Sequence, residues 1–190
     1  MADPGPVRIR LAREADIPAL VDAHARSWRA SYGDLLPAGL IEDVLAARDA
    51  RAERWRTRLA DPSDPGAFLV AEIAGQAVGL AITGPSRDED GDAATGEVYA
   101  IYLDPGVIGR GVGRALFAAA VADLVSRGFE RAILWVLSDN MRARRFYEAA
   151  GWRPDGATKR DVRDGGTLDG TRYRRELPRR GGGKLPPPPG

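Results

Sequence analysis

The chain reads Ile108-Gly109-Arg110-Gly111-Val112-Gly113-Arg114 between an apolar run and an alanine-rich segment, and this stretch decides the fold. The apolar run, Glu97–Leu103, predicts a strand, and Gly111–Arg127 predicts a helix because its apolar residues recur every four positions. Alternate glycines let the backbone approach a ligand closely and turn its N–H groups outward. The helix N-terminus adds free N–H donors and a positive dipole, so the stretch predicts a diphosphate site with Arg110 and Arg114 at its rim.

Two common phosphate-binding motifs do not fit this stretch. Counted from Gly109, the dinucleotide pattern G-x-G-x-x-G would need its third glycine where Arg114 stands. A P-loop needs Gly-Lys-Ser or Gly-Lys-Thr, and the only Gly-Lys pair of the chain, Gly183-Lys184, is followed by Leu185. Taken alone, the stretch fits a glycine turn without a ligand as well as it fits a phosphate loop.

A second segment, Asn140–Trp152, directly follows the predicted strand Arg131–Leu137 and predicts a helix closed by Gly151. Asn140 and Tyr147 lie seven residues apart, which is two turns along one helix face. For this segment alone two interpretations remain. Either Asn140 only caps the helix and Tyr147 only packs in the core, or both side chains face a ligand.

At this separation, the two segments together resemble the GCN5-related N-acetyltransferase (GNAT) superfamily. The acyl-CoA loop of that family, Q/R-x-x-G-x-G/A at the start of a helix, aligns with Ile108–Gly113. The later family pattern of Asn, Phe-Tyr and a closing Gly-aromatic pair matches Asn140, Phe146-Tyr147 and Gly151-Trp152. Ile108 replaces the usual Gln or Arg, but the loop donates mainly through its backbone. The resemblance therefore implies weaker side-chain anchoring and an intact site.

The resemblance covers residues 7–177 and implies an α/β fold with a mixed, mostly antiparallel sheet. It implies roughly six to seven strands flanked by about four helices in one domain. The pattern of apolar and turn residues predicts strands at 7–11, 67–74, 77–83, 97–103, 131–137, from 152 onward and at 172–177. It predicts helices from residues 16 and 37, and over 48–59, 111–127 and 140–150, with a turn at Gly75-Gln76 and an exposed loop over Gly84–Gly96.

The chemistry implied by the resemblance is direct attack of an amine on the thioester of acetyl-CoA, without a covalent acyl-enzyme. Tyr147 matches the position of the family's general acid, and a phenol with a pKa of about 10 suits a departing thiolate. Glu97 is a candidate general base, directly or through water, and it is equally interpretable as a solvated residue at a strand end. The residues implied to bind acetyl-CoA are Ile101, Tyr102, Leu103, Ile108, Gly109, Arg110, Gly111, Val112, Gly113, Arg114, Asn140 and Tyr147.

Strand alternation predicts that Glu97, Tyr99, Ile101 and Leu103 share one face of their strand. In the family this strand splays from the next one, so its free backbone groups pair with the pantetheine arm like an added strand. Some family members that acetylate protein N-termini carry a glutamate five residues before the Asn. Trp135 stands there, so that arrangement is not reproduced.

Composition narrows the function further. The chain has 190 residues, 28 Lys+Arg and 27 Asp+Glu, and this balance argues against general nucleic-acid binding. Cysteine is absent, which excludes thiolate catalysis and cysteine zinc sites. His24 is the only histidine, so a multi-histidine metal site cannot be built. On a helix with Leu20 and Trp28, His24 is predicted to pack at a half-buried face rather than act as a base. We expect no metal.

No apolar run approaches the roughly 18 residues that span a bilayer, and residues 1–6 do not form a secretory signal. We therefore expect no membrane partner and a cytoplasmic location. The predicted organisation is a flexible leader at 1–6, one domain over 7–177 and a disordered Gly/Pro-rich tail at 178–190.

Three functional hypotheses follow. The first is an N-acetyltransferase that acts on a primary amine of a small molecule or peptide, and the second is a non-catalytic acyl-CoA-binding or sensing module with the same fold. The third is a different nucleotide-binding α/β protein. Tyr147 and Glu97 favour the enzyme. Acceptor pockets use variable loops, so the sequence leaves the acceptor open, together with any preference for another acyl-CoA and the oligomeric state, a homodimer included.

Overall fold

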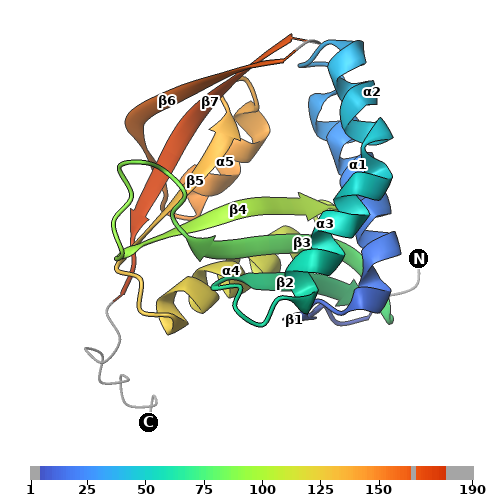
Figure 1. The fold of residues 1–190 in the computed structure, drawn as a ribbon, viewed down its shortest axis with the longest axis horizontal. Coiled ribbons are helices and arrows are strands. Elements are labelled where there is room, and N and C mark those ends of the chain that lie inside the picture. The colour runs from blue at the N-terminus through green and yellow to red at the C-terminus, as the bar shows by residue number, and fades with distance from the viewer. Residues whose placement is uncertain (1–4, 164–165, 179–190) are drawn as a thin grey trace.

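The structure, a computed structural model, describes residues 5–163 and 166–178. Within these residues seven strands form one sheet in the order β1-β2-β3-β4-β5-β7-β6 (Figure 1). The strands are β1 (Arg8–Leu11), β2 (Ala67–Ile73), β3 (Gln76–Pro85), β4 (Thr95–Leu103), β5 (Arg131–Leu137), β6 (Arg153–Arg163) and β7 (Gly166–Glu176). The helices are α1 (Ile17–Tyr32), α2 (Ala38–Ala46), α3 (Arg48–Ala60), α4 (Val112–Ser126) and α5 (Met141–Ala149), with short 3₁₀ turns η1 (Glu14–Asp16) and η2 (Pro105–Val107). The predicted fold class is confirmed, with five α-helices in place of about four.

The centre of the sheet splits between β4 and β5. These two strands are parallel neighbours, and their pairing runs only from Thr95↔Arg131 to Val98↔Leu134. Beyond that point β4 stays with β3 and β5 stays with β7, so β4 and β5 diverge (Figure 1). The later residues of β4 therefore have backbone groups on the β5 side that no strand of the described sheet uses.

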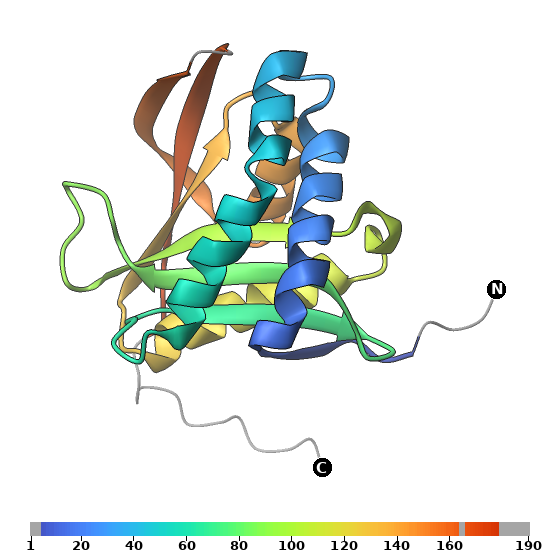
Figure 2. The same cartoon turned by 45° about the vertical axis from the view of Figure 1, so that its right-hand side comes forward.

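Helices cover both faces of the sheet (Figure 2). On one face, α4 buries Val112, Leu116 and Ala120 against β2 and β3. On the other face, α1 and α3 bury an apolar cluster against the same strands, which includes Ile17, Leu20, Trp55, Phe68 and Val70. Apolar area removed from water stabilises both contacts by about 25 cal/mol per Å². The helix α5 packs beside α4 through the ring of Phe117.

A bulge in the pairing of β3 with β4 corrects the expected alternation. Ile82 pairs with Ala100 and Thr83 with Val98, so Tyr99 is an extra residue. After the bulge, Ile101 packs on the α4 side, whereas Tyr99 packs on the α1–α3 side. A Cβ on Gly96 would meet Leu124 of α4, so the next residue, Glu97, points to the opposite side. The prediction that Glu97 and Tyr99 share a face with Ile101 and Leu103 is wrong.

Several predicted boundaries also shift. Positive φ values at Ala74 and Gly75 place the first hairpin turn there, one residue before Gly75-Gln76. The strand β3 extends to Pro85 and β4 begins at Thr95, so the loop predicted over Gly84–Gly96 spans 86–94. The strand predicted from residue 172 begins at Gly166, because β6 and β7 form one long hairpin.

The predicted leader and tail lie largely outside the described residues, at 1–4 and 179–190. At the near end of the predicted tail, Leu177 is buried and its N–H donates to the carbonyl of Glu130 at 2.8 Å. Over the described ranges, no helix is both long enough and apolar enough to cross a membrane. Those same ranges contain no cluster of three acidic or histidine side chains that could hold a metal ion.

His24 lies inside an aromatic cluster rather than at a half-buried face. It is 3% exposed and contacts the rings of Trp28, Trp55 and Tyr102 at centroid distances of 5.9, 5.9 and 4.5 Å. The pKa of His24 is lowered from 6.5 to about 3, mainly by burial, with smaller contributions from the nearby cations Arg51 and Arg54. The neutral ring is thus a core residue, more deeply buried than the half-buried position expected from the sequence.

This burial makes His24 a source of acid sensitivity. Below pH 6.5 the unfolded chain binds a proton at His24, whereas the folded chain binds it only near pH 3. The free energy of unfolding therefore falls as the pH drops from 6.5 towards 3. Between pH of about 7.5 and about 4.5 the loss is roughly 2–3 kcal/mol. His24→Phe should remove this part of the slope, and His24→Gln should do the same. Urea unfolding at both pH values measures the free energy of unfolding. If its change with pH in the variants equals that of the unsubstituted protein, the prediction is wrong.

Candidate functional site

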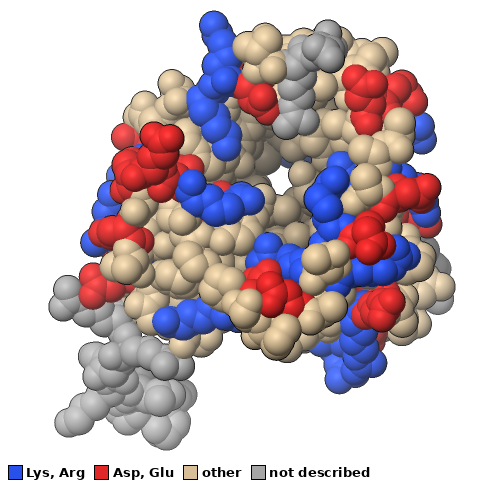
Figure 3. Space-filling view, in the orientation of Figure 1, with Lys and Arg blue, Asp and Glu red and all other residues tan. Residues whose placement is uncertain are grey.

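A cavity of about 730 Å³ occupies the gap where β4 and β5 diverge. Its walls come from the later half of β4, the loop before α4, the end of β5, the start of α5, and the facing side of α1. Figure 3 shows it as an opening in the middle of the molecule, between the α1–α2 helices and the β5–β7 strands. Of the residues predicted to form the site, the following line this cavity: Ile101, Tyr102, Leu103, Ile108, Gly109, Gly111, Gly113, Arg114, Asn140 and Tyr147.

Three predicted site residues do not line the cavity in the described structure. Val112 is fully buried and belongs to the core beneath α4, so only its backbone is near the site. The Arg110 side chain is exposed, outside the cavity wall. Glu97 is buried behind the wall, next to Val98, which lines it.

The glycines of the loop have two different roles. Gly109 and Gly111 have φ values of +84° and +80°, and a Cβ on either would meet no atom of the protein within 4 Å. Their open side therefore leaves room for a ligand to approach the backbone. Gly113 serves packing instead, because its Cβ would lie 2.8 Å from Cδ1 of Leu103.

Asn140 and Tyr147 both line the cavity from the side of α5. The Oδ1 of Asn140 accepts a hydrogen bond from the N–H of Ala143 at 3.0 Å, which caps α5. Tyr147 is 7% exposed, and its ring packs against Phe117 and Phe146. These residues support the helix and also line the cavity, so a ligand-binding role for them stays a prediction.

The Tyr147 hydroxyl is suited to hold a proton. Among the described residues, none forms a hydrogen bond with it, and the side chain lines the cavity. Burial raises the pKa of Tyr147 above its ordinary value of 10.0, and proximity to Tyr102 adds to the shift. The phenol is therefore neutral at ordinary pH and available as a donor.

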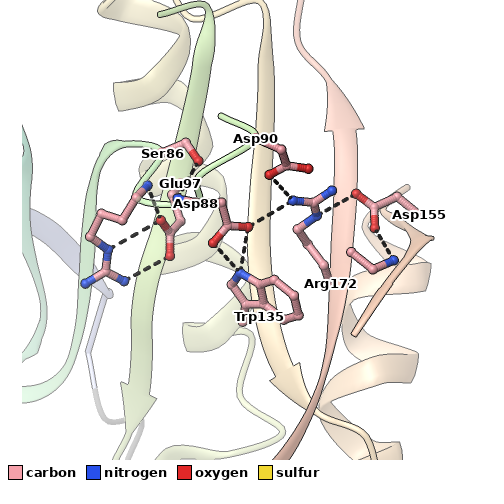
Figure 4. Close-up of polar contacts among 9 residues, drawn as sticks. Ser86, Asp88, Asp90, Glu97, Trp135, Asp155 and Arg172 are labelled. Atoms are coloured by element: carbon pink, nitrogen blue, oxygen red, sulfur yellow. Dashed lines mark hydrogen bonds and ion pairs between the residues drawn. The ribbon is translucent and has the colours of Figure 1, made fainter. Parts of the chain in front are cut away.

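Glu97 is held by Arg87, the second residue of the β3–β4 loop (Figure 4). The backbone N–H of Arg87 donates to Glu97 Oε2 at 2.9 Å, and the Arg87 guanidinium donates to Oε1 at 2.9 Å. The side chain of Glu97 is 4% exposed. Its carboxylate is fixed close to the cavity, and it reaches a ligand there only through an intervening water or a movement of Arg87.

A polar network that the sequence did not reveal fixes the rest of the loop at residues 86–94 (Figure 4). Both carboxylate oxygens of Asp88 accept from Trp135 Nε1 at 3.0 Å. Arg172 on β7 pairs with Asp88 at 3.0 Å, Asp90 at 2.6 Å and Asp155 at 2.8 Å. An acidic run in the sequence signals a charged loop, but no spacing rule pairs it with an arginine more than eighty residues away.

Comparison with known proteins decides the family. A profile of the acetyltransferase (GNAT) family matches residues 21–152. The chain belongs to this family. It is 32% identical over 134 residues to the uncharacterized N-acetyltransferase YuaI of Bacillus subtilis (strain 168), across 70% of this chain and 73% of that protein.

Two further similarities concern part of the sequence and the fold. Over 63 residues the chain is 51% identical to mycothiol acetyltransferase of Beutenbergia cavernae, covering 33% of this chain but only 21% of that protein. A crystal structure of the PaiA N-acetyltransferase of Thermoplasma acidophilum in complex with coenzyme A matches with a TM-score of 0.70 at 18% identity. That match covers 90% of this chain and 99% of the other, and it shows the GNAT fold.

The GNAT family and the enzyme class predicted from the sequence are therefore confirmed. The protein is an acetyltransferase of this family. The acceptor, and the residues of this chain that bind and react, are not specified by these similarities.

Proposed function

We propose that this GNAT acetyltransferase transfers an acetyl group from acetyl-CoA directly to a primary amine of a small molecule or peptide, with Tyr147 as general acid. The observation that carries the proposal is the shared cavity. The Tyr147 hydroxyl, the open glycine loop and the splayed part of β4 all border one space. A sensing module would need the loop and the strand but not a buried proton donor beside them.

The residues present fit acetyl-CoA. Its diphosphate suits the N–H groups around Gly109 and Gly111, at the positive end of α4, with Arg114 adding charge. Its amide-containing arm suits the backbone of Ile101–Leu103 that β5 leaves unused. When bound, it supplies an activated acyl thioester.

The proton balance of the transfer gives two residues their roles. A carbon–nitrogen bond forms and the carbon–sulfur bond breaks, so the amine loses a proton and the sulfur gains one. Tyr147 holds the proton that the sulfur takes. Glu97 accepts the proton of the amine through a water, since Arg87 occupies both of its oxygens directly. Solvent then restores both groups.

The test of this function offers acetyl-CoA and a panel of small amines and peptides to the purified protein. We expect thiol release with at least one amine, and mass spectrometry should find one added acetyl group on that amine. Stabilisation by acetyl-CoA but not by ATP or NAD in a thermal-shift assay should accompany it. Binding of acetyl-CoA without acetylation of any amine would favour a sensing module.

Location in the cytoplasm and self-association into a homodimer remain predictions.

Gly111→Val tests the loop. At φ +80° a β-branched residue is strained, and its side chain would enter the open space where we place the diphosphate. We expect acetyl-CoA affinity to fall about tenfold or more, which corresponds to about 1.4 kcal/mol or more. Isothermal titration measures it.

Gly128→Val is the matched control for this change. Gly128 has a φ of +88° and an equally open Cβ direction, but it lies at the far end of α4. It should produce similar strain and unchanged affinity. If both variants lose affinity equally, backbone strain explains the effect and the loop assignment is wrong.

A further inference from the structure

We infer that the amine acceptor carries a carboxylate and that Lys159 binds this group. The inference rests on the proposed function, and it names the acceptor class that the described structure favours. Lys159 lies on β6 and lines the same cavity as Tyr147. It is a specificity-determining residue in this inference and takes no part in proton transfer.

The position of Lys159 depends on a glycine in the neighbouring strand. Lys159 pairs with Gly170 of β7. A Cβ on Gly170 would lie 3.1 Å from Cγ and 3.4 Å from Cε of Lys159, and 3.4 Å from Cε3 of Trp135. Because Gly170 has no side chain, the stem of Lys159 crosses over β7 and places Nζ 4.2 Å from the centre of the Trp135 ring.

This cation faces the side of the sheet that is opposite to α4 and α5. Leu134 and Val136 pack in the core beneath those helices, and Trp135 alternates with them. The Lys159 ammonium lies over the ring of Trp135, and Trp28 and Tyr99 line the same cavity. The cavity that an amine enters from this side is lined by aromatic rings, by the Lys159 ammonium and by Asp161 of the same strand.

The charge of Lys159 is not neutralised as its neighbours are. Arg87 pairs with Glu97, and Arg172 pairs with three aspartates. Among the described residues, Lys159 forms no ion pair with a carboxylate, and its ammonium contacts the ring of Trp135. Burial lowers the pKa of Lys159, and the fields of Asp88, Glu97 and Asp161 offset this only in part. An anion on the acceptor would relieve the desolvation of the ammonium.

A carboxylate fits this wall better than a phosphate. A single lysine provides one point charge, whereas phosphate sites in proteins usually combine an arginine fork or a helix N-terminus with several donors. On this wall both arginines near Lys159, Arg87 and Arg172, already bind carboxylates of the protein. We therefore expect amino acids or peptides with a free C-terminus as acceptors.

The experiment compares matched acceptors. Amino acids and short peptides are offered beside their C-terminal amides, with acetyl-CoA, and acetylation is quantified by mass spectrometry. We expect the acids to have kcat/KM values about 10–100 times higher than the amides, since a hydrogen bond to a charged group contributes about 1.5–3 kcal/mol. The difference should lie in the KM of the acceptor.

Three variants test whether Lys159 causes the preference for acids over amides. Lys159→Met keeps the length of the stem and should bring the acids down to the level of the amides, with the KM for acetyl-CoA unchanged. Lys159→Arg should retain most of the preference. Arg160→Met is the control, because Arg160 also lies on β6 but pairs with Asp169 outside this cavity. It should leave the preference intact.

The outcomes separate the inference from the proposed function. If amides or simple amines are acetylated as well as the acids, the acceptor needs no carboxylate and the inference is wrong while acetyl transfer stands. If the acids are preferred but Lys159→Met keeps that preference, another group binds the carboxylate and Lys159 is misassigned. If no amine of any kind is acetylated, the proposed function fails and the inference fails with it.

Discussion

Tyr147→Phe should lower kcat by about 10²–10⁴-fold, the usual loss on removal of a general acid. The substitution keeps the ring, which packs against Phe117, Phe146 and Tyr173, and removes only the hydroxyl. Binding of acetyl-CoA and the melting temperature should therefore change little. A fall in kcat with a steady KM marks an interaction that is made mostly in the transition state.

The pH dependence gives a second readout for Tyr147. Its pKa is raised above 10.0, so the phenol stays protonated throughout the range in which the protein is assayed. Loss of activity through ionisation of Tyr147 is expected only above pH of about 10. If activity instead falls with an apparent pKa below about 10, the group that ionises is not Tyr147.

Tyr173→Phe is the matched control for Tyr147→Phe. Tyr173 is also buried, with its ring centre 6.1 Å from that of Tyr147, but its hydroxyl donates to Glu148 and accepts from Arg144. Losing those bonds should cost about 1–3 kcal/mol in stability and leave kcat near the original value. Unchanged turnover in Tyr147→Phe, measured where chemistry limits the rate, would show that water or another donor serves the thiolate.

Arg172→Met should destabilise the fold by about 2–4 kcal/mol. Removal of one partner from a buried ion pair typically costs about 3–5 kcal/mol, because the remaining charges stay uncompensated. We expect somewhat less here, since the Asp90 side chain is 64% exposed, although those of Asp88 and Asp155 are only 19% and 16% exposed. For a chain of this size the melting temperature should fall on the order of 10 °C.

Arg174→Met provides the comparison for Arg172→Met. Arg174 lies on the same strand, and it pairs at the surface with Glu176, whose side chain is 68% exposed. A surface change of this kind should alter stability by no more than about 0.5 kcal/mol. Equal melting temperatures for the two variants would mean that the loop at 86–94 is not fixed by Arg172.

Local signals in the sequence were sufficient for most helices and strands and for most of the cavity wall, whereas the fold class followed from the family resemblance. The glycine pattern predicted the start of α4, and Gly111 is the left-handed N-cap. The spacing of Asn140 and Tyr147 predicted one helix face, and both side chains line the cavity. These features depend on residues close together in the chain, where helix and turn preferences act.

Features set by distant pairing could not be predicted. Strict alternation misplaced Glu97 and Tyr99, because the bulge arises from the register of β3 against β4. The contacts of Asp88 with Trp135 and Arg172 join three separate segments. Lys159 drew no attention, since its place in the cavity depends on the lack of a side chain at Gly170 across the hairpin.

Direct transfer is tested most simply by mixing the protein with acetyl-CoA in equal amounts and adding the best acceptor amine afterwards. Free thiol and the intact mass of the protein are followed before and after the addition. Direct attack predicts no thiol and no added mass on the protein until the amine arrives, and then one thiol for each acetylated amine. A release of thiol before the amine is present, with a matching acetyl group on the protein, would contradict direct transfer and require a covalent intermediate.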